Sequence, residues 1–352
     1  MLILYDYKLK LFKMKVFVTG GTGYIGSHTV VELQNSGFEV IIVDNLSNSN
    51  LKVLDGIQAI TGIRPEFENF DLSDRILVLD FLKRHRDINA IIHFAALKAV
   101  GESIHKPLDY YRTNLCSIMN LLEGMKEFNI KNFVFSSSCT VYGQPNKLPV
   151  TENTERQKAE SPYGNTKSIS EDIMKDFANV QKDLNLLALR YFNPIGAHPS
   201  AEIGELPNGI PQNLIPYLTQ VVSGIRKELN IFGDDYNTSD GTAIRDYIDV
   251  VDLAKAHVIA IKRLLDNKNE ANYEYFNVGT GNGVSVMELV HAFERATGKK
   301  VNYKIVGRRE GDIEKIWADT SLANEKLGWK AQVPLEETLR NTWRWQQKNT
   351  EV

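Results

Sequence analysis

A glycine-rich segment near the N-terminus most constrains how this chain of 352 residues can fold. Residues 18–28 read VTGGTGYIGSH, which places Gly20, Gly23 and Gly26 directly after a β-branched stretch and before an apolar helical one. Glycines at this spacing allow a tight turn, close approach of a pyrophosphate to the backbone, and close packing of a helix on a strand. The N-terminus of the helix would then face the anion with its free amide groups. The segment therefore predicts a dinucleotide-binding turn between the first strand and the first helix.

Short β-branched runs alternate with longer amphipathic stretches along the first half of the chain. The runs predicted as strands are Lys15–Thr19, Val40–Asp44, Phe67–Asp71, Ala90–Ala95, Asn132–Ser136 and Leu184–Arg190. Strands that alternate with helices are joined by right-handed crossovers and form a parallel sheet with helices on both faces. We predict a Rossmann-type, doubly wound α/β domain over residues 14–192. Its best-marked helix follows Ser161 and Pro162, an N-cap and a first-turn proline.

Beyond residue 193 the sequence changes to longer connections rich in Gly, Pro and Asn, with helices expected near 214–226, 250–266 and 285–297. Long ordered loops in a compact enzyme are usually functional. Residues 193–352 are therefore expected to form a smaller α/β substrate-binding lobe, from which a segment near 234–252 could return to the first domain. Residues 1–13 precede a second methionine, Met14, and are interpreted as an N-terminal extension.

Charge and cysteine usage argue against several classes of protein. The formal net charge is −3 and no long Lys/Arg run is present, so neither nucleic acid nor an anionic membrane is an expected partner. No stretch is apolar enough over a sufficient length to predict a transmembrane helix. The two cysteines, Cys116 and Cys139, form no CxxC pair, which suits a reducing cytoplasm. The seven histidines show no ligand spacing, so no metal is expected.

Asp44 ends the second predicted strand at the spacing expected of the carboxylate that binds the adenosine ribose diol. A 2′-phosphate would place negative charge against this carboxylate, and no arginine stands next to it in the sequence. The predicted cofactor is therefore NAD rather than NADP. A strand-end aspartate that merely caps a turn is the alternative interpretation.

Tyr163 and Lys167 stand four residues apart at the start of the helix that follows Ser161, so their side chains share one face. The preceding strand ends in three serines, 136–138, at the edge of the sheet where ligands bind. A phenol with a pKa of ~10 is a poor base at neutral pH, but a nearby ammonium and a positive nicotinamide ring favour the phenolate. We therefore expect redox chemistry on a bound substrate, with Ser138 sharing the proton path.

The whole chain from Met14 nearly to the C-terminus resembles one family. The matching segments, in order, are TGGTGYIGSH, DNLSNS, HFAALKAVGES, FSSSCTVYG, SPYGNTKS, LRYFNPIGAHPS, GIPQNLIPY, DGTAIRDYI and RREGD. They resemble the extended branch of the short-chain dehydrogenases/reductases and, within it, the UDP-glucose 4-epimerases. So many ordered matches make a chance resemblance negligible.

The resemblance implies a role for each matching position in binding NAD. Positions expected at the phosphates are Gly20, Gly23, Tyr24, Ile25 and Gly26; at the adenosine, Asp44, Asn45, Asn48, Ser49, Asp71 and Leu72. Positions expected to line the cofactor further along are Phe94, Ala95, Leu97 and Lys98, with Asn114 or the neighbouring Thr113, and Phe192 beside the nicotinamide. Ser138, Tyr163 and Lys167 match the catalytic positions and are expected to contact the cofactor as well.

The resemblance also implies a UDP-sugar site and a reaction. The matching positions are Asn193, Asn213, Leu214, Asn230, Ile231, Phe232, Arg245, Arg309, Asp312 and Ile316. Two arginines can clamp a pyrophosphate through bidentate hydrogen bonds, and Asp312 can accept from ribose hydroxyls. The family interconverts UDP-galactose and UDP-glucose, in galactose metabolism, through a transient 4-keto sugar that turns while its UDP stays anchored. A homodimer is implied as well.

Three alternatives remain open at this point. Ile316 stands at a sugar-pocket position where relatives vary between tyrosine and smaller residues, so UDP-N-acetylglucosamine 4-epimerase activity is one. A nucleotide-sugar 4,6-dehydratase needs an acid and a base after the strand-five hydroxyl, where this chain has Cys139 and Thr140. A non-catalytic NAD-binding module has the same fold, but such proteins commonly lack the Tyr/Lys pair that is present here.

Overall fold

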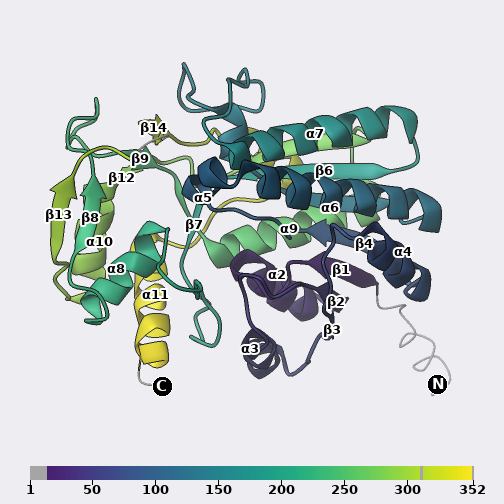
Figure 1. Ribbon diagram of the computed structural model, residues 1–352, viewed down its shortest axis with the longest axis horizontal. Coiled ribbons are helices and arrows are strands. Elements are labelled where there is room, and N and C mark those ends of the chain that lie inside the picture. Colours follow the sequence, from purple (N-terminus) through teal and green to yellow (C-terminus); the bar gives the residue numbers. More distant parts are fainter. Residues whose placement is uncertain (1–13, 310–311, 351–352) are drawn as a thin grey trace, which may run out of the picture.

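The computed structural model describes residues 14–309 and 312–350, so the predicted extension over residues 1–13 lies outside the described residues. The chain forms two lobes (Figure 1). The larger lobe is a sheet with helices on both faces, and the smaller one gathers helices and short strands from the second half of the chain.

One parallel sheet organises the larger lobe. Its strands are β1 (Lys15–Thr19), β2 (Glu39–Val43), β3 (Glu66–Glu68), β4 (Ile88–His93), β5 (Asn132–Ser138), β6 (Asn185–Tyr191) and β11 (Tyr273–Val278). Their order is β11-β6-β5-β4-β1-β2-β3, and every neighbouring pair is parallel. The strand order reverses between β1 and β4, which is where ligands bind in open sheets of this kind. The predicted doubly wound fold is confirmed.

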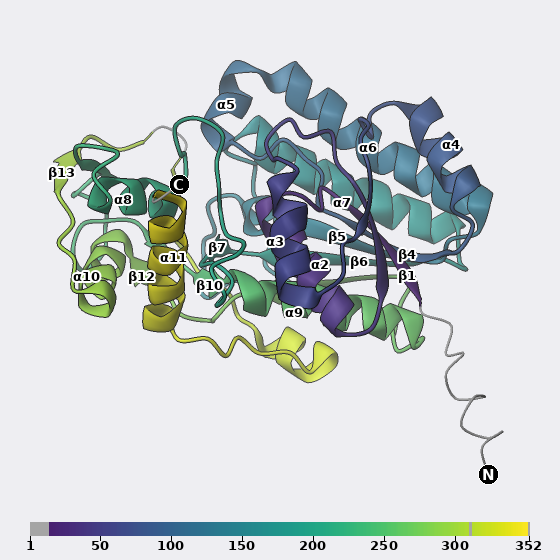
Figure 2. The ribbon, with the colours of Figure 1, turned by 90° about the horizontal axis from the view of Figure 1, so that it is seen from below.

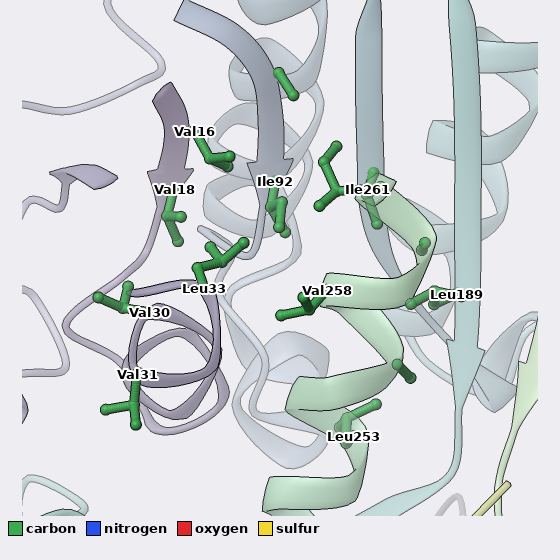
Figure 3. Close-up of a cluster of buried hydrophobic side chains, with 14 of the residues drawn as sticks. Val16, Val18, Val30, Val31, Leu33, Ile92, Leu189, Leu253, Val258 and Ile261 are labelled. Atoms are coloured by element: carbon green, nitrogen blue, oxygen red, sulfur yellow. The ribbon is translucent and has the colours of Figure 1, made fainter. Parts of the chain in front are cut away.

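The two faces of the sheet are covered by different helices (Figure 1). Helices α2 (Tyr24–Asn35), α3 (Lys52–Thr61) and α9 (Val250–Leu265) cover one face; α4 (Arg75–Arg84), α6 (Pro107–Phe128) and α7 (Pro162–Val180) cover the other. Successive side chains of a strand point to opposite faces. Val16 and Val18 therefore pack with α2 and α9 (Figure 3), whereas Phe17 between them packs with α4 and α6. Both faces of this sheet are buried, as expected of a parallel sheet.

The smaller lobe has a hydrophobic core of its own. It is built from α8 (Leu214–Val222), α10 (Val286–Thr297), α11 (Leu335–Thr350), the parallel pair β8 (Leu229–Phe232) and β13 (Tyr303–Val306), and the sheet of β12 (Val284–Ser285), β9 (Ile244–Arg245) and β14 (Lys315–Ile316). Leu218, Phe293 and Leu339 meet in its centre. Figure 2 shows these helices grouped at one end of the molecule. Between the lobes, β7 (Asn193–Ile195) pairs with β10 (Tyr247–Asp249) in parallel. The remaining short helices are α5 (Val100–His105), η1 (Cys139–Tyr142) and η2 (Ala323–Leu327).

Apart from shifts of one or two residues at the ends of elements, the structure differs from the sequence predictions in three places. The third strand was predicted over Phe67–Asp71 but ends at Glu68, because the carboxylate of Asp71 accepts the amide of Ser73 and turns the chain toward α4. Helix α8 ends at Val222, since Gly224 adopts a φ of +80°. The segment 250–278 was placed in the second lobe, yet α9 covers the first sheet and β11 joins its edge beside β6.

Candidate active site

The glycine-rich turn lies at the point where the strand order reverses, and it is packed too closely to admit side chains. Gly20 follows β1 with a φ of +66°, and a Cβ there would lie 2.7 Å from the amide nitrogen of Ala95 in the loop after β4. A Cβ on Gly26, in α2, would lie 2.2 Å from the carbonyl oxygen of Gly20. Both distances are shorter than van der Waals contact, so a larger residue at either position would push the turn away from its neighbours.

The N-terminus of α2 is suited to bind an anion. Its N-cap, Gly23, has no side chain that could cap the helix, and no acidic residue stands in the first turn. The first amide groups of an α-helix have no partner within the helix, and the helix dipole favours negative charge there. The amides of Tyr24 and Ile25 therefore fit the diphosphate of a dinucleotide.

The residues predicted to hold the adenosine lie together at the ends of β2 and β3. Asp44 accepts hydrogen bonds from the amide of Leu46 at 2.9 Å and from the hydroxyl of Ser49 at 3.2 Å. Asn45 donates to Asp71 at 3.0 Å. Burial raises the pKa of Asp71, but hydrogen bonds from Ser73 and Asn45 outweigh it and lower the pKa below its usual value. Asn48 lies exposed in the same loop as Asp44, and Leu72 is buried directly after Asp71. The cluster offers a fixed carboxylate to a ribose diol, while Asp44 also caps a turn.

Asn114 of α6 holds the loop after β4 in place through hydrogen bonds. The side-chain amide of Asn114 exchanges two hydrogen bonds with the backbone of Leu97, at 2.8 and 3.0 Å, and donates to the hydroxyl of Thr166 at 3.0 Å. Asn114 thereby joins this loop to α7. On the same loop the ring of Phe94 lies 4.6 Å from that of His257, and Lys98 points to Glu205 of the second lobe at 3.5 Å. The contacts of Asn114 thus position the predicted cofactor-binding loop.

Tyr163 and Lys167 lie in the first two turns of α7, opposite the end of β5. The hydroxyl of Ser161 accepts the amide of Gly164 at 3.1 Å and so fixes the start of the helix. Lys167 donates from Nζ to the carbonyl oxygen of Ser136 at 2.8 Å, and its Nζ lies 5.9 Å from the centre of the Tyr163 ring. Ser138, the last residue of β5, lies near the phenol of Tyr163 and acts to lower its pKa. The three predicted catalytic side chains are therefore brought together.

Burial is the largest influence on the pKa values of Tyr163 and Lys167. It raises the pKa of Tyr163 well above its usual value, and the nearby Ser138 offsets only part of that effect. It lowers the pKa of Lys167 to about 7, against the opposing influence of Glu171. The protein alone therefore keeps the phenol protonated. A positive charge close to the phenol, such as that of an oxidised nicotinamide, would favour the phenolate.

A pocket of about 390 Å³ lies in the second lobe next to β7. It is lined by Asn193, Asn213, Leu214, Asn230, Ile231, Phe232, Arg245, Arg309 and Asp312, which are all the predicted substrate residues except Ile316. The guanidinium of Arg245 binds the carboxylate of Asp312 and also donates to the carbonyl of Ile244 at 2.8 Å. The side-chain oxygen of Asn230 is buried and has no hydrogen-bond partner among the described residues.

Ile316 lies outside this pocket lining but close to the catalytic group. It is 1% exposed and belongs to a small apolar cluster with Cys139 and Phe192. Cys139 directly follows Ser138, so this cluster lies between the end of β5 and β14. A sugar that extends from the pocket toward Tyr163 would therefore pass this apolar surface.

Several residues that shape the site were not predicted. Glu205 lines the pocket, accepts from Asn213 at 2.6 Å and pairs with Lys98. Asp246, next to Arg245, is fully buried and accepts the amides of Thr280 at 2.8 Å and Gly281 at 3.0 Å. Both act through contacts between segments distant in the chain, which no local pattern indicates. The glycine turn after β11 thus holds the neighbour of Arg245 in place.

Comparison with known proteins gives a consistent family. The model of the family described as GDP-mannose 4,6 dehydratase matches residues 17–342. The UDP-glucose 4-epimerase of Mus musculus is 49% identical, over 95% of this chain and 97% of its own. The chain belongs to the UDP-glucose 4-epimerases. They form part of the extended short-chain dehydrogenase/reductase superfamily.

Solved structures of UDP-glucose 4-epimerases share the whole fold. That of Stenotrophomonas maltophila, with bound NAD and formylated UDP-arabinopyranose, is 48% identical with a TM-score of 0.92, covering 96% of this chain and 99% of its own. That of Bifidobacterium longum, in complex with NAD+ and UDP, is 44% identical with a TM-score of 0.91, over the same shares.

The residues after Ser138 distinguish the epimerase from the dehydratase for which the family model is described. Dehydration of a nucleotide sugar requires an acid and a base at this point. Burial raises the pKa of the Cys139 thiol to about 12, so the thiol stays neutral and is a poor acid or base near neutral pH. The next residue, Thr140, has a buried hydroxyl with no hydrogen-bond partner among the described residues. Neither residue supplies a carboxyl group.

Proposed function

We propose that this chain interconverts UDP-galactose and UDP-glucose by inverting C4 of the sugar, with NAD as cofactor, and that it serves galactose metabolism. The observation that carries the proposal is the grouping of Tyr163, Lys167 and Ser138 at the carboxyl end of β5, on the edge of the sheet where the glycine-rich turn follows β1. It occurs in a chain that is 49% identical to UDP-glucose 4-epimerases over nearly its full length. The two alternatives, UDP-N-acetylglucosamine epimerisation and dehydration, are not favoured by these relatives.

NAD would be held by the turn and loops described above. The amides of Tyr24 and Ile25 face its diphosphate, and Asp44 accepts from the adenosine ribose. When bound, NAD supplies a nicotinamide that takes hydride from C4 of the sugar and returns it to the opposite face. The carboxylate of Asp44 disfavours a 2′-phosphate by charge repulsion, so NADP is not the expected cofactor.

Tyr163 would handle the proton of the sugar 4-OH. Its phenolate accepts that proton as the 4-keto sugar forms and returns it after the sugar has turned. Ser138 lies near the same phenol and can share the proton with the substrate oxygen. Lys167 is held beside the phenol because its Nζ donates to the carbonyl of Ser136, and in its protonated form it favours the phenolate. The three side chains thus take one proton from the sugar 4-OH and later return it to the same oxygen.

The UDP moiety would stay anchored while the sugar turns. Arg245 and Arg309 line the same pocket, and both can donate to a diphosphate. In the protein alone Arg245 binds Asp312, so a diphosphate and a ribose would take over both partners of that ion pair. Because the contacts to UDP stay the same throughout the reaction, the keto sugar can rotate without being released.

Two further statements belong to the proposal. We expect a homodimer, for which the exposed apolar side chains of Leu108 and Met119 on α6 provide a contact surface. We also expect a cytoplasmic enzyme, because its free cysteines, Cys116 and Cys139, suit a reducing compartment. None of the helices within residues 14–350 that the structure describes is long and apolar enough to cross a membrane. Light scattering coupled to gel filtration tests the dimer.

The decisive experiment is incubation of the purified protein with UDP-galactose, followed by nuclear magnetic resonance of the product sugar. Formation of UDP-glucose without loss of water is the expected result. A parallel incubation with UDP-N-acetylgalactosamine tests how large a substituent passes Ile316. Failure to invert C4 of either sugar would refute the epimerase function, and a 4-keto-6-deoxy product would identify a dehydratase instead.

A further inference from the structure

Helix α7 carries a third buried ionisable side chain on the face that bears Tyr163 and Lys167. Glu171 follows Lys167 by four residues, one helical turn further along, and its side chain is 2% exposed. No part of the chemistry proposed above uses it. All three side chains face the last residues of β5: Tyr163 meets Ser138, Lys167 meets the carbonyl of Ser136, and Glu171 accepts the hydroxyl of Ser137 at 2.6 Å.

Glu171 is bound on its other side by Arg190 of β6. The guanidinium donates from Nη2 to one carboxylate oxygen at 2.6 Å and from Nε to the other at 3.0 Å. Two parallel bonds of this kind fix the relative orientation of a guanidinium and a carboxylate. Both side chains are almost completely buried, so neither is screened by water. The pair therefore locks α7 to β6 one turn away from Lys167.

The same arginine extends the network to the residues that follow Ser138. Arg190 donates from Nη1 to the phenol of Tyr142, at 3.0 Å, and that phenol donates to the side chain of Asn277 at 2.6 Å. Tyr142 closes η1, the short helix that begins immediately after Ser138. A displacement of Glu171 would therefore be transmitted to both sides of the catalytic group, to α7 and to the chain after β5.

We propose that Glu171, held by Arg190, is a positioning residue for the epimerase reaction: it fixes α7 against the end of β5 and supplies the negative charge that keeps the Lys167 ammonium charged. The inference rests on the proposed function, because it assigns a task to Lys167 in that reaction. Glu171 itself does not reach the substrate, since it lies one turn beyond Lys167 on the side away from Tyr163.

The charged and titratable groups around Lys167 support this assignment. On α7 they are Tyr163 and Glu171; β4 contributes His93, and β6 contributes Arg190 and Tyr191. Burial lowers the pKa of His93 to about 3, so its imidazole is neutral. Burial raises the pKa of both phenols, so they are neutral as well. Glu171 is thus the group in this set that opposes the effect of burial on the Lys167 pKa.

The test is the pH profile of kcat for Glu171→Gln. Lys167 must be protonated to favour the phenolate, so activity is present below the Lys167 pKa and lost above it. Removing the carboxylate lowers that pKa, and the alkaline limb of the profile should move down by about 1 pH unit. A merely structural role would lower kcat at all pH values without moving the limb. An alkaline limb that stays in place would overturn the proposal.

A matched control comes from the same lobe. Glu274 forms a comparable ion pair with Arg263, at 2.9 Å, and both side chains are 10% exposed. Glu274→Gln removes a carboxylate from a partly buried pair away from Lys167, and its alkaline limb should stay at the wild-type pH. If Glu171→Gln does not fold, Glu171→Asp, which keeps the charge but draws it back by one methylene, should move the limb in the same direction by less, and an unmoved limb there would refute the proposal equally.

A second readout separates this inference from the epimerase function. The phenolate of Tyr163 can be followed by ultraviolet difference absorbance between each protein and its Tyr163→Phe counterpart. The titration is done with NAD+ bound, because its positive nicotinamide favours the phenolate at a pH where Lys167 is still charged. Under these conditions the phenolate should form at higher pH in Glu171→Gln than in wild type, because the neighbouring ammonium is lost earlier. If wild type fails to epimerise UDP-galactose, the proposed function is wrong, and this titration still decides whether Glu171 controls Lys167. An unchanged titration would refute that control.

Discussion

Substitution of Gly26 by alanine should weaken the binding of NAD more than it lowers the stability of the fold. The added Cβ would lie 2.2 Å from the carbonyl oxygen of Gly20 and 2.9 Å from the Cα of Gly21. Both neighbours are backbone atoms of the turn, so neither can rotate away. Relief requires α2 to move by roughly 1 Å relative to the turn, since close packing does not tolerate shorter contacts.

That displacement moves the amides of Tyr24 and Ile25 away from the diphosphate. A hydrogen bond to a charged group contributes about 1.5–3 kcal/mol, so the loss of two costs about 3–6 kcal/mol of binding free energy. The dissociation constant for NAD should therefore rise by about 10²- to 10⁴-fold. Overpacking should also lower the free energy of unfolding, by about 1–3 kcal/mol.

Isothermal titration calorimetry of nucleotide-stripped protein with NAD measures the effect directly. Gly307→Ala is the matched control: a Cβ there meets nothing within 4 Å and the residue has no positive φ, so NAD affinity and stability should stay at the wild-type values. If Gly26→Ala binds NAD as tightly as wild type, the turn is not the diphosphate site and the reasoning fails.

Three further outcomes are expected. Tyr163→Phe should bind NAD and UDP as wild type does but lose about 10²- to 10⁴-fold in kcat, because only the proton acceptor is removed; unaltered turnover in a coupled assay would contradict this role. Arg245→Met should weaken UDP binding by about 10²-fold in calorimetry, as charge-assisted bonds are lost and Asp312 is left unpaired, whereas Arg308→Met, outside the pocket lining, should not. Burial raises the pKa of Asp249 to about 6, so its contribution to stability is present at low pH and lost as pH rises through about 6. Asp249→Asn should therefore gain up to about 3 kcal/mol relative to wild type between about pH 4 and pH 7 in urea unfolding, and a pH-independent difference would exclude the effect.

The first lobe could be predicted because its information is local. β1, β2 and β4 are marked by runs rich in Val and Ile, and Ser161 marks the start of α7 by side-chain chemistry that the structure confirms. β11 was missed because its partner, β6, lies far away in the sequence and because the chain beyond residue 193 was assigned as a whole to the second lobe. Its place in the sheet follows from tertiary pairing, which periodicity cannot show.

The residues of the site likewise fall into those that a local sequence pattern predicts and those that it does not. Tyr163 and Lys167 lie on one helix, so their spacing alone places them on one face, and Glu171 could have been found by extending the same spacing by one turn. Glu205 and Asp246 could not, because their roles depend on Lys98 and on the turn after β11, which are far from them in the chain. Contacts of this kind arise only once the lobes have assembled.

The connection between the lobes explains how hydride transfer can occur at both faces of the sugar while its nucleotide stays anchored. β7 continues from β6 by way of Phe192, and its first residue, Asn193, donates its amide to the carbonyl of Asp246 at 2.9 Å. Asp246 is the neighbour of Arg245, so the UDP pocket is hydrogen-bonded to the chain that leaves the catalytic sheet. The phenol of Tyr24, on the helix after the glycine-rich turn, donates to the carbonyl of Gly196 at 2.7 Å and ties the end of the same segment to the dinucleotide site. With both ends of the site fixed to one backbone segment, the sugar between them is the part left free to turn.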